Sequence, residues 1–145
     1  LSGLGWDAQA PFAEGALGAA LLAPTRLYVK QALAAVRAGG VHALAHITGG
    51  GLTENLPRVL PEGLGATIDL SSWPLPGVFR WLAETAGMAE PELLKTFNCG
   101  IGMIVVVAAD RADAIAALLA EQGETVTRIG TVTEGQGVSY AGRLL

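Results

Sequence analysis

The sequence predicts an α+β fold in three α/β/α layers, with helices packed on both faces of a mixed β-sheet. Two observations support this prediction. Helix-like and strand-like patterns alternate from about residue 26 to the C-terminus, so neither type is confined to one half of the chain. The segment IGMIVVV, residues 101–107, is apolar with no polar alternation, which is typical of a strand covered on both faces. We therefore expect residues 101–107 to form the central strand of the sheet.

The first expected element is a helix over residues 26–38. Val29, Leu33 and Val36 recur at the spacing of one helical face, which should be the face that packs on the sheet. Thr25 stands where a side chain can cap the helix N-terminus.

Two strands are expected after this helix. The segment VHALAHIT, residues 41–48, is compatible with a strand. The segment ATIDL, residues 66–70, alternates more clearly, because Ala66, Ile68 and Leu70 fall on one face of a strand.

The C-terminal half continues the alternation. A helix is expected to open at Pro76 and to stop at Gly87, and a second helix is capped by Asp110 and ends at Gly123. The remaining expected strands are 125–132 and an edge strand within 137–145.

The composition excludes several classes of protein. Hydrophobic residues make up 51% of the chain, yet no stretch approaches the roughly 18 uninterrupted apolar residues of a membrane span. The formal net charge of −4 argues against nucleic-acid binding, which depends on clustered Lys and Arg. The single cysteine, Cys99, allows no internal disulfide and fits a reducing compartment. We therefore expect a cytoplasmic protein that binds neither nucleic acid nor membrane.

The N-terminal 20 residues differ from the rest of the chain. Residues 1–20 mix Gly, Ala and Pro with no steady period and carry two isolated aromatic residues, Trp6 and Phe12. This composition is typical of a connecting segment. We expect residues 1–20 to be a linker and residues 21–145 to be the folded domain.

Three consecutive glycines, Gly49 to Gly51, follow the expected strand and precede a helix start in the segment HITGGGLTENLPRVLP. Glycine-rich backbone at such a point offers free N–H groups to a phosphate or carboxylate. The alternative is a tight turn that only requires positive φ. The segment matches neither the P-loop pattern nor the Rossmann pattern, so the glycines alone do not predict nucleotide binding.

Two histidines flank this region. His42 and His46 fall on one face of either a strand or a helix, but a catalytic zinc site needs three protein ligands, and no third ligand stands nearby. We therefore predict no metal site. His46 lies closer to the glycines, where an imidazole can exchange protons with a bound ligand.

The neighbouring polar residues have two possible roles. Asn55 is either a cap for the short helix at Pro57 or a ligand contact. Glu54 and Arg58 are four residues apart and can pair at the surface. In the segment TFNCGIGM, Cys99 is expected to be a small packed residue, because no base stands beside it in the sequence.

Four segments of the chain resemble a known family when they are taken in order. These are LLAPTRLYVK, HALAHITGGGLTENLPRVLP, SSWPLPGVFRWL and TFNCGIGMIVVV. They resemble the C-terminal domain of the phosphoribosylformylglycinamidine cyclo-ligases, also called aminoimidazole ribonucleotide (AIR) synthetases. Many other members of the wider superfamily resemble a D-x-T-G-G-G pattern, whereas this chain has His46 in place of the Asp.

The resemblance implies an AIR synthetase C-terminal domain-like fold with partly ferredoxin-like topology. It implies a missing N-terminal domain that binds ATP and Mg2+ and forms a homodimer. The reaction it implies converts formylglycinamidine ribonucleotide and ATP to aminoimidazole ribonucleotide, ADP and phosphate. By motif position, His46 would act in catalysis, and the phosphate-binding residues would be Thr48, Gly49, Gly50, Gly51 and Asn55.

Two other interpretations remain open. The chain could belong to another ATP-dependent member of the superfamily, of the thiamine-phosphate kinase or selenophosphate synthetase type. It could also be an autonomous phosphate-binding regulatory module.

Overall fold

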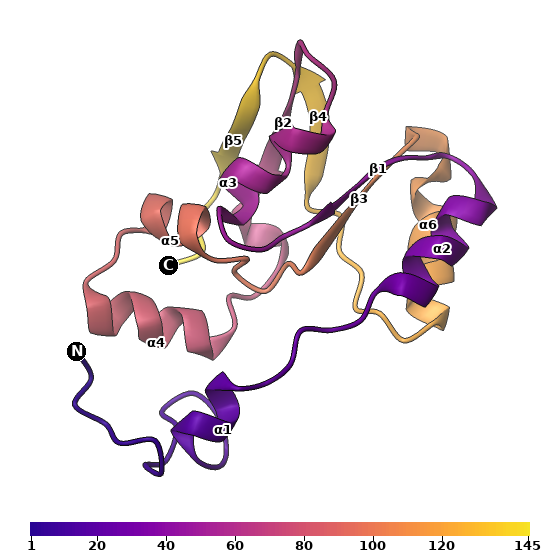
Figure 1. Cartoon of the computed structure of the whole chain (residues 1–145). Coiled ribbons are helices and arrows are strands. Elements are labelled where there is room, and N and C mark those ends of the chain that lie inside the picture. Colours follow the sequence, from indigo (N-terminus) through magenta and orange to yellow (C-terminus); the bar gives the residue numbers. More distant parts are fainter.

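The computed structural model describes the whole chain, residues 1–145, as five strands and six α-helices joined by short turns (Figure 1). None of the helices is both long and apolar enough to cross a membrane. The α-helices are α1 (Leu17–Leu21), α2 (Val29–Ala38), α3 (Gly51–Asn55), α4 (Gly77–Ala86), α5 (Glu90–Thr96) and α6 (Ala112–Glu121). The strands are β1 (Val41–His46), β2 (Leu64–Asp69), β3 (Met103–Val107), β4 (Gly130–Glu134) and β5 (Gly137–Ala141). Three 3-10 helices are η1 (Pro57–Val59), η2 (Leu70–Ser72) and η3 (Ala109–Arg111).

The strands form two small sheets. In the three-stranded sheet, β2 lies between β4, which is antiparallel to it, and β5, which is parallel. This sheet is therefore mixed, and the predicted α+β class with a mixed sheet is confirmed. The prediction that Ala66, Ile68 and Leu70 share one buried face is also confirmed, because all three side chains are buried. The edge strand expected within 137–145 is β5.

The prediction that residues 101–107 form the central strand of the sheet is wrong. Strand β3 pairs only with β1, in antiparallel register, and its other edge has no strand beside it. Within β3 only Ile104 is buried. The expected strand at 125–132 begins only at Gly130, and no backbone N–H of residues 125–129 donates a hydrogen bond to a backbone carbonyl. An apolar run identifies a strand, but it does not say how many neighbours the strand has.

Helix α2 exposes the face that was expected to be buried. Its buried residue is Ala35, whereas Val29, Leu33 and Val36 are 66%, 46% and 47% exposed. The helix begins at Val29 rather than at residue 26, and no side chain caps it. Residues 23–28, directly before it, have no regular secondary structure.

Helix α4 was predicted and helix α5 was not. Pro76 stands at the N-cap of α4, and Gly87 ends it in a left-handed conformation at φ 62°. Helix α5 buries Leu93 and Leu94 fully or nearly so. It is only seven residues long, too short to show a clear period, although it carries the proline and acidic residues typical of a helix start.

The first 20 residues are partly folded. They include the start of α1, and Ala10 and Leu17 are buried. The ring of Phe12 lies 5.2 Å from that of Trp81 in α4, whereas Trp6 is exposed. The segment therefore packs on the domain rather than hanging free of it, although a linker role for residues 1–20 stays a prediction.

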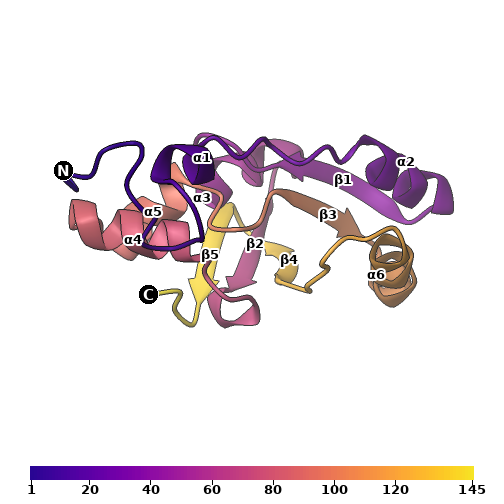
Figure 2. The ribbon, with the colours of Figure 1, turned by 90° about the horizontal axis from the view of Figure 1, so that it is seen from below.

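Two hydrophobic clusters stabilise the fold. The larger one joins α3, α5, β2 and the loop at Cys99, and the smaller one joins Ala35 of α2 to Ile115 and Leu119 of α6. Seen from below, α4 and α5 lie toward one end, α2 and α6 at the other, and the strands between them (Figure 2). The β1–β3 pair links the two clusters, and the end of β1 carries the glycine turn to the surface.

Candidate functional site

The turn between β1 and α3 presents free backbone N–H groups. The N–H groups of Thr48, Gly49 and Gly50 donate to no backbone carbonyl, whereas the N–H of Gly51 closes the turn on the Thr48 carbonyl at 3.0 Å. Thr48 and Gly49 are exposed. Successive free N–H groups in a turn form a concave site that suits an anion.

The three glycines have different surroundings. A Cβ on Gly51 would collide with the backbone carbonyl of Leu94, so this glycine lets α3 pack against α5. Gly50 has a φ of +98°, and a Cβ there would lie 2.9 Å from the Cβ of Glu54. Gly49 has no positive φ, and a Cβ there would meet nothing within 4 Å. The fold therefore explains Gly50 and Gly51 but not Gly49.

Asn55 holds this turn from the inside. Its Nδ2 donates to the carbonyl oxygens of Thr48, Gly49 and Gly51 at 3.3, 3.1 and 2.8 Å. In a trans peptide the C=O and N–H point in opposite directions. Because the carbonyls of Thr48 and Gly49 face Asn55, the next N–H groups, of Gly49 and Gly50, face away from it. The direct ligand contact assigned to Asn55 from the sequence is not supported, because its amide hydrogens are used by the turn.

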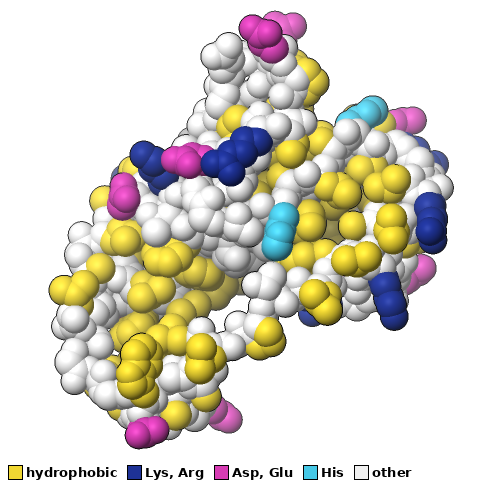
Figure 3. All heavy atoms as spheres, viewed as in Figure 1, with side chains coloured by type: hydrophobic (Ala, Val, Ile, Leu, Met, Phe, Trp, Pro, Cys, Tyr) yellow, Lys and Arg dark blue, Asp and Glu magenta, His cyan; other side chains and the backbone are white.

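A polar cavity of about 410 Å3 lies beside the turn. His46 and Thr48 line it from β1 and the turn. The ring of Tyr28 meets the His46 ring edge-on at 5.9 Å and 71°. No hydrogen bond joins the His46 side chain to any other residue, so both of its ring nitrogens are available to a ligand. Figure 3 shows the two histidines as separate patches on one face, with hydrophobic side chains gathered near them.

A positively charged side chain lies at the edge of this cavity. Arg26 lines the cavity and is held by Glu124, with Nε 2.8 Å from a carboxylate oxygen, while Nη2 donates to the Gly123 carbonyl at 2.9 Å. Burial raises the pKa of the neighbouring Tyr28 hydroxyl, and the Glu124 carboxylate raises it further. Tyr28 therefore stays protonated at neutral pH and can donate a hydrogen bond.

The loop between α5 and β3 forms the opposite wall. Asn98 lines the cavity, and its Oδ1 accepts the Gly100 N–H at 3.0 Å. The Trp73 indole donates to the Cys99 carbonyl at 2.9 Å, which fixes the loop from below. A Cβ on Gly102 would collide with the Tyr28 hydroxyl, so this glycine admits the tyrosine.

Cys99 is a packed residue, as predicted. It is fully buried, and burial raises the pKa of its thiol to about 12. Its backbone has a positive φ of 52°, which helps the loop to turn. The predicted surface pair also forms, with 3.5 Å between Arg58 Nη2 and Glu54 Oε2.

No three His, Cys, Asp or Glu side chains lie close enough together to hold a metal ion. A β-bulge falls at His42, between the register pairs of Val41 and Ala43.

The sequence predicted part of this site. His46 and Thr48 line the same cavity, whereas Gly49 to Gly51 do not line it. The roles predicted for these residues stay predictions. Arg26 and Tyr28 were missed because they were expected inside a helix, and the mixture of basic and aromatic residues in PTRLYVK was the signal that could have found them. Asn98 and Gly102 lie in the segment TFNCGIGM, whose pattern alone does not show that it faces the glycine turn.

A comparison with models of protein families identifies the family of this chain. Residues 2–142 match the model of the AIR synthase related protein, C-terminal domain. The chain belongs to this family. Because the match spans nearly all of the residues, the glycine turn and the cavity both lie within the family domain.

Solved structures with a similar fold include a kinase and a hydrogenase maturation protein. Thiamine-monophosphate kinase from Stenotrophomonas maltophilia K279a is 25% identical with a TM-score of 0.56, over 76% of this chain and 34% of that one. HypE of E. coli is 27% identical with a TM-score of 0.61, over 81% and 36%. The protein tt0281 from Thermus thermophilus is 27% identical with a TM-score of 0.51, over 70% and 32%. The chain thus spans about a third of each of these proteins.

Proposed function

We propose that this chain is the C-terminal domain of an ATP-dependent phosphoribosylformylglycinamidine cyclo-ligase and that its glycine turn holds a phosphate group of the substrate or of the transferred phosphoryl. The observation that carries the proposal is Gly49, an exposed glycine that the fold does not require and that stands between the free N–H groups of Thr48 and Gly50. Thr48, at the start of this turn, lines the same cavity as His46. Two or three charge-assisted hydrogen bonds to a phosphate suit this geometry.

Each side chain of the cavity has a role under this proposal. Thr48 adds a hydroxyl to the N–H groups of the turn, and the Arg26 guanidinium, which is paired with Glu124, lines the same cavity. His46 lies within the same cavity with both ring nitrogens free, so it exchanges a proton with the bound substrate as the ring closes. ATP and Mg2+ would supply the phosphoryl group and its charge neutralisation, and under this proposal an N-terminal domain of the full-length enzyme would bind both.

A second function is favoured by the structural comparison. The similarity to a thiamine-monophosphate kinase and to HypE supports another ATP-dependent enzyme of the superfamily. The motifs TFNCGIGM and ENLPRVLP, together with His46 in place of an Asp, favour the cyclo-ligase over these.

The test compares substrates on the full-length protein that carries these 145 residues. With ATP and Mg2+ present, phosphate release is measured on formylglycinamidine ribonucleotide and, separately, on thiamine monophosphate. We expect ring closure with the first substrate only. The His46→Asn variant should lower kcat by about 100-fold and alter its pH profile, because the replacement keeps a polar group but cannot titrate.

Turnover of thiamine monophosphate but not of formylglycinamidine ribonucleotide would contradict the cyclo-ligase proposal and show that the full-length protein is a kinase. The 145-residue chain alone is the control and should be inactive with either substrate, because phosphoryl transfer needs positioned metal and cationic groups that this chain does not provide.

A further inference from the structure

An arginine contacts the residue that holds the glycine turn. Arg58 belongs to η1, which begins at Pro57 directly after α3. Residues three and four positions apart lie on one face of a helix, so Arg58 faces Asn55 and Glu54. Its Nη1 donates to Asn55 Oδ1 at 3.4 Å, and its Nη2 lies 3.5 Å from Glu54 Oε2. The guanidinium is therefore shared between the amide behind the turn and a carboxylate.

Asn55 transmits this contact to the turn. Its amide oxygen accepts from Arg58, and its amide nitrogen donates to three carbonyl oxygens of the turn. Asn55 is only 7% exposed, and Arg58 is the one side chain that donates to its oxygen. A positive charge on the oxygen makes the amide N–H groups stronger donors, and hydrogen bonds in such a chain polarise one another. Two of the three carbonyls share their peptide units with the free N–H groups of Gly49 and Gly50, so the effect reaches these N–H groups.

We propose that Arg58 is a positioning residue of the phosphate site and that its guanidinium acts through the Asn55 amide on the N–H groups that receive the phosphate. This inference rests on the proposed phosphate site. Glu54 acts in the opposite direction, because its carboxylate offsets the guanidinium and its Oε2 lies 2.8 Å from the place that a Cβ on Gly50 would take. A negative charge so close to the turn opposes an incoming anion.

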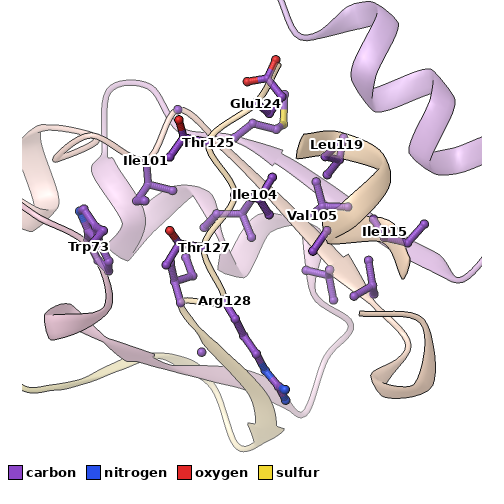
Figure 4. A pocket seen from close by; sticks show the side chains of 18 of the residues that line it. Trp73, Ile101, Ile104, Val105, Ile115, Leu119, Glu124, Thr125, Thr127 and Arg128 are labelled. Carbon is purple, nitrogen blue, oxygen red and sulfur yellow. The ribbon is translucent and has the colours of Figure 1, made fainter. Parts of the chain in front are cut away.

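The two charges can be removed one at a time at the surface. The side chains of Arg58 and Glu54 are 62% and 44% exposed, so neither change opens the core. Arg58→Met keeps an aliphatic stem but removes the charge and the donors, whereas Arg58→Lys keeps the charge. Arg128 is the matched control, because it is also exposed, forms no ion pair and lines a second, larger cavity of about 760 Å3. In Figure 4 its guanidinium points away from Ile104 and Leu119.

The experiment is an NMR titration of the 15N-labelled 145-residue chain with inorganic phosphate at constant ionic strength. Arg58→Met should weaken phosphate binding about threefold, because the charge it removes is exposed and acts through a chain of hydrogen bonds. It should also shift the signals of the Gly49 and Gly50 amides and of the Asn55 side chain before any phosphate is added. Arg58→Lys should recover affinity. Glu54→Gln should strengthen binding about threefold, and Arg128→Met should leave both affinity and signals as in the parent chain.

Each failure has a distinct meaning. A parent chain that binds no phosphate at residues 48–50 would overturn the phosphate site and, with it, this inference. An Arg58→Met variant with the parent affinity, or with weaker binding but unshifted signals in the absence of phosphate, would overturn the role of Arg58 and leave the phosphate site standing. An equal loss in Arg128→Met would show a general effect of net charge, which would also contradict the proposal. If melting shows that Arg58→Met does not fold, Glu54→Gln decides, since an affinity no higher than that of the parent chain would overturn the proposal.

Discussion

At the scale of single residues, the glycine turn shows why a sequence motif and a binding site are different things. Gly50 and Gly51 are required by the fold, one by its positive φ and the other by the closeness of Leu94. Gly49 faces open space in an ordinary conformation. The three glycines are adjacent in the sequence, so their different surroundings could not be predicted from it. A Gly→Ala series separates binding from folding.

Gly49→Ala should leave stability nearly unchanged and weaken phosphate about tenfold or more, because the methyl group occupies the space of the anion. Gly51→Ala should lower the free energy of unfolding by more than about 2 kcal/mol, because its methyl group meets backbone that cannot move without separating α3 from α5. Thermal melting and phosphate titration of both variants provide the check. Equal losses of stability in the two variants would make the whole turn structural.

Cys99 provides a prediction for alkaline pH. Burial raises the pKa of its thiol from 9.0 to about 12, so the folded state keeps the proton where the unfolded state has lost it. Its contribution to stability is therefore complete below about pH 9 and decreases as the pH rises from there toward 12. The Cys99→Ala variant should lose less stability than the parent chain between about pH 9 and about pH 10.5 in urea titrations. Rapid reaction of the native thiol with an alkylating reagent at about pH 8 would show that Cys99 is not buried in this way.

At the scale of elements, the turn depends on a contact between two of them. Asn55 at the end of α3 donates to carbonyls at the end of β1, and this fixes where the free N–H groups point. The sequence left open whether Asn55 caps a helix or binds a ligand. The structure assigns it a third role, since the side chain folds back on the preceding turn, and a contact of this kind depends on the path of the backbone.

The Asn55→Asp variant tests this role. A carboxylate has the same size but donates no hydrogen bond, and it would face three carbonyl oxygens in a largely buried position. We expect a loss of about 2 kcal/mol or more in the free energy of unfolding and weaker phosphate binding. Restoration of the parent stability at acid pH, where the carboxyl group is protonated, would support the mechanism. An Asp variant as stable at neutral pH as the parent would contradict it.

The elements themselves were predictable to different degrees. Helix α4 and strand β2 follow local signals, namely a proline start, a glycine stop and a clear alternation. Helix α5 is too short to show a periodic pattern. Strand β3 was predicted to have a strand on each side but pairs only with β1, because strand pairing is decided by segments distant in the sequence. The same limitation applies to the site: His46 and Thr48 are local to the motif, whereas Tyr28 and Asn98 reach it from elsewhere in the chain.

At the scale of the whole molecule, exposed apolar side chains are grouped on the surface rather than scattered singly. Leu22, Leu27 and the outer face of α2 are exposed together, and Figure 3 shows hydrophobic side chains over α2 and the β1–β3 pair. A contiguous apolar area of this kind is typical of an interaction surface.

We expect the isolated chain to associate at high concentration and to bind the dye ANS. Sedimentation of the Leu33→Glu variant beside the parent chain checks this, since a charge in the middle of the exposed α2 face should reduce association without touching the core. A parent chain that stays monomeric and binds no dye would show that this face is not an interface.

The free N–H groups of Thr48, Gly49 and Gly50 are the centre of the proposed function, and their amide NMR signals report on them directly. Addition of inorganic phosphate to the 15N-labelled chain should shift these three amide signals and that of Tyr28 in a saturable way, because a bound anion polarises the N–H groups that it accepts from. The shifts should disappear in Gly49→Ala, whose fold is intact. Saturable shifts confined to other parts of the chain, with residues 48–50 unaffected, would contradict the assignment of the glycine turn as the phosphate site.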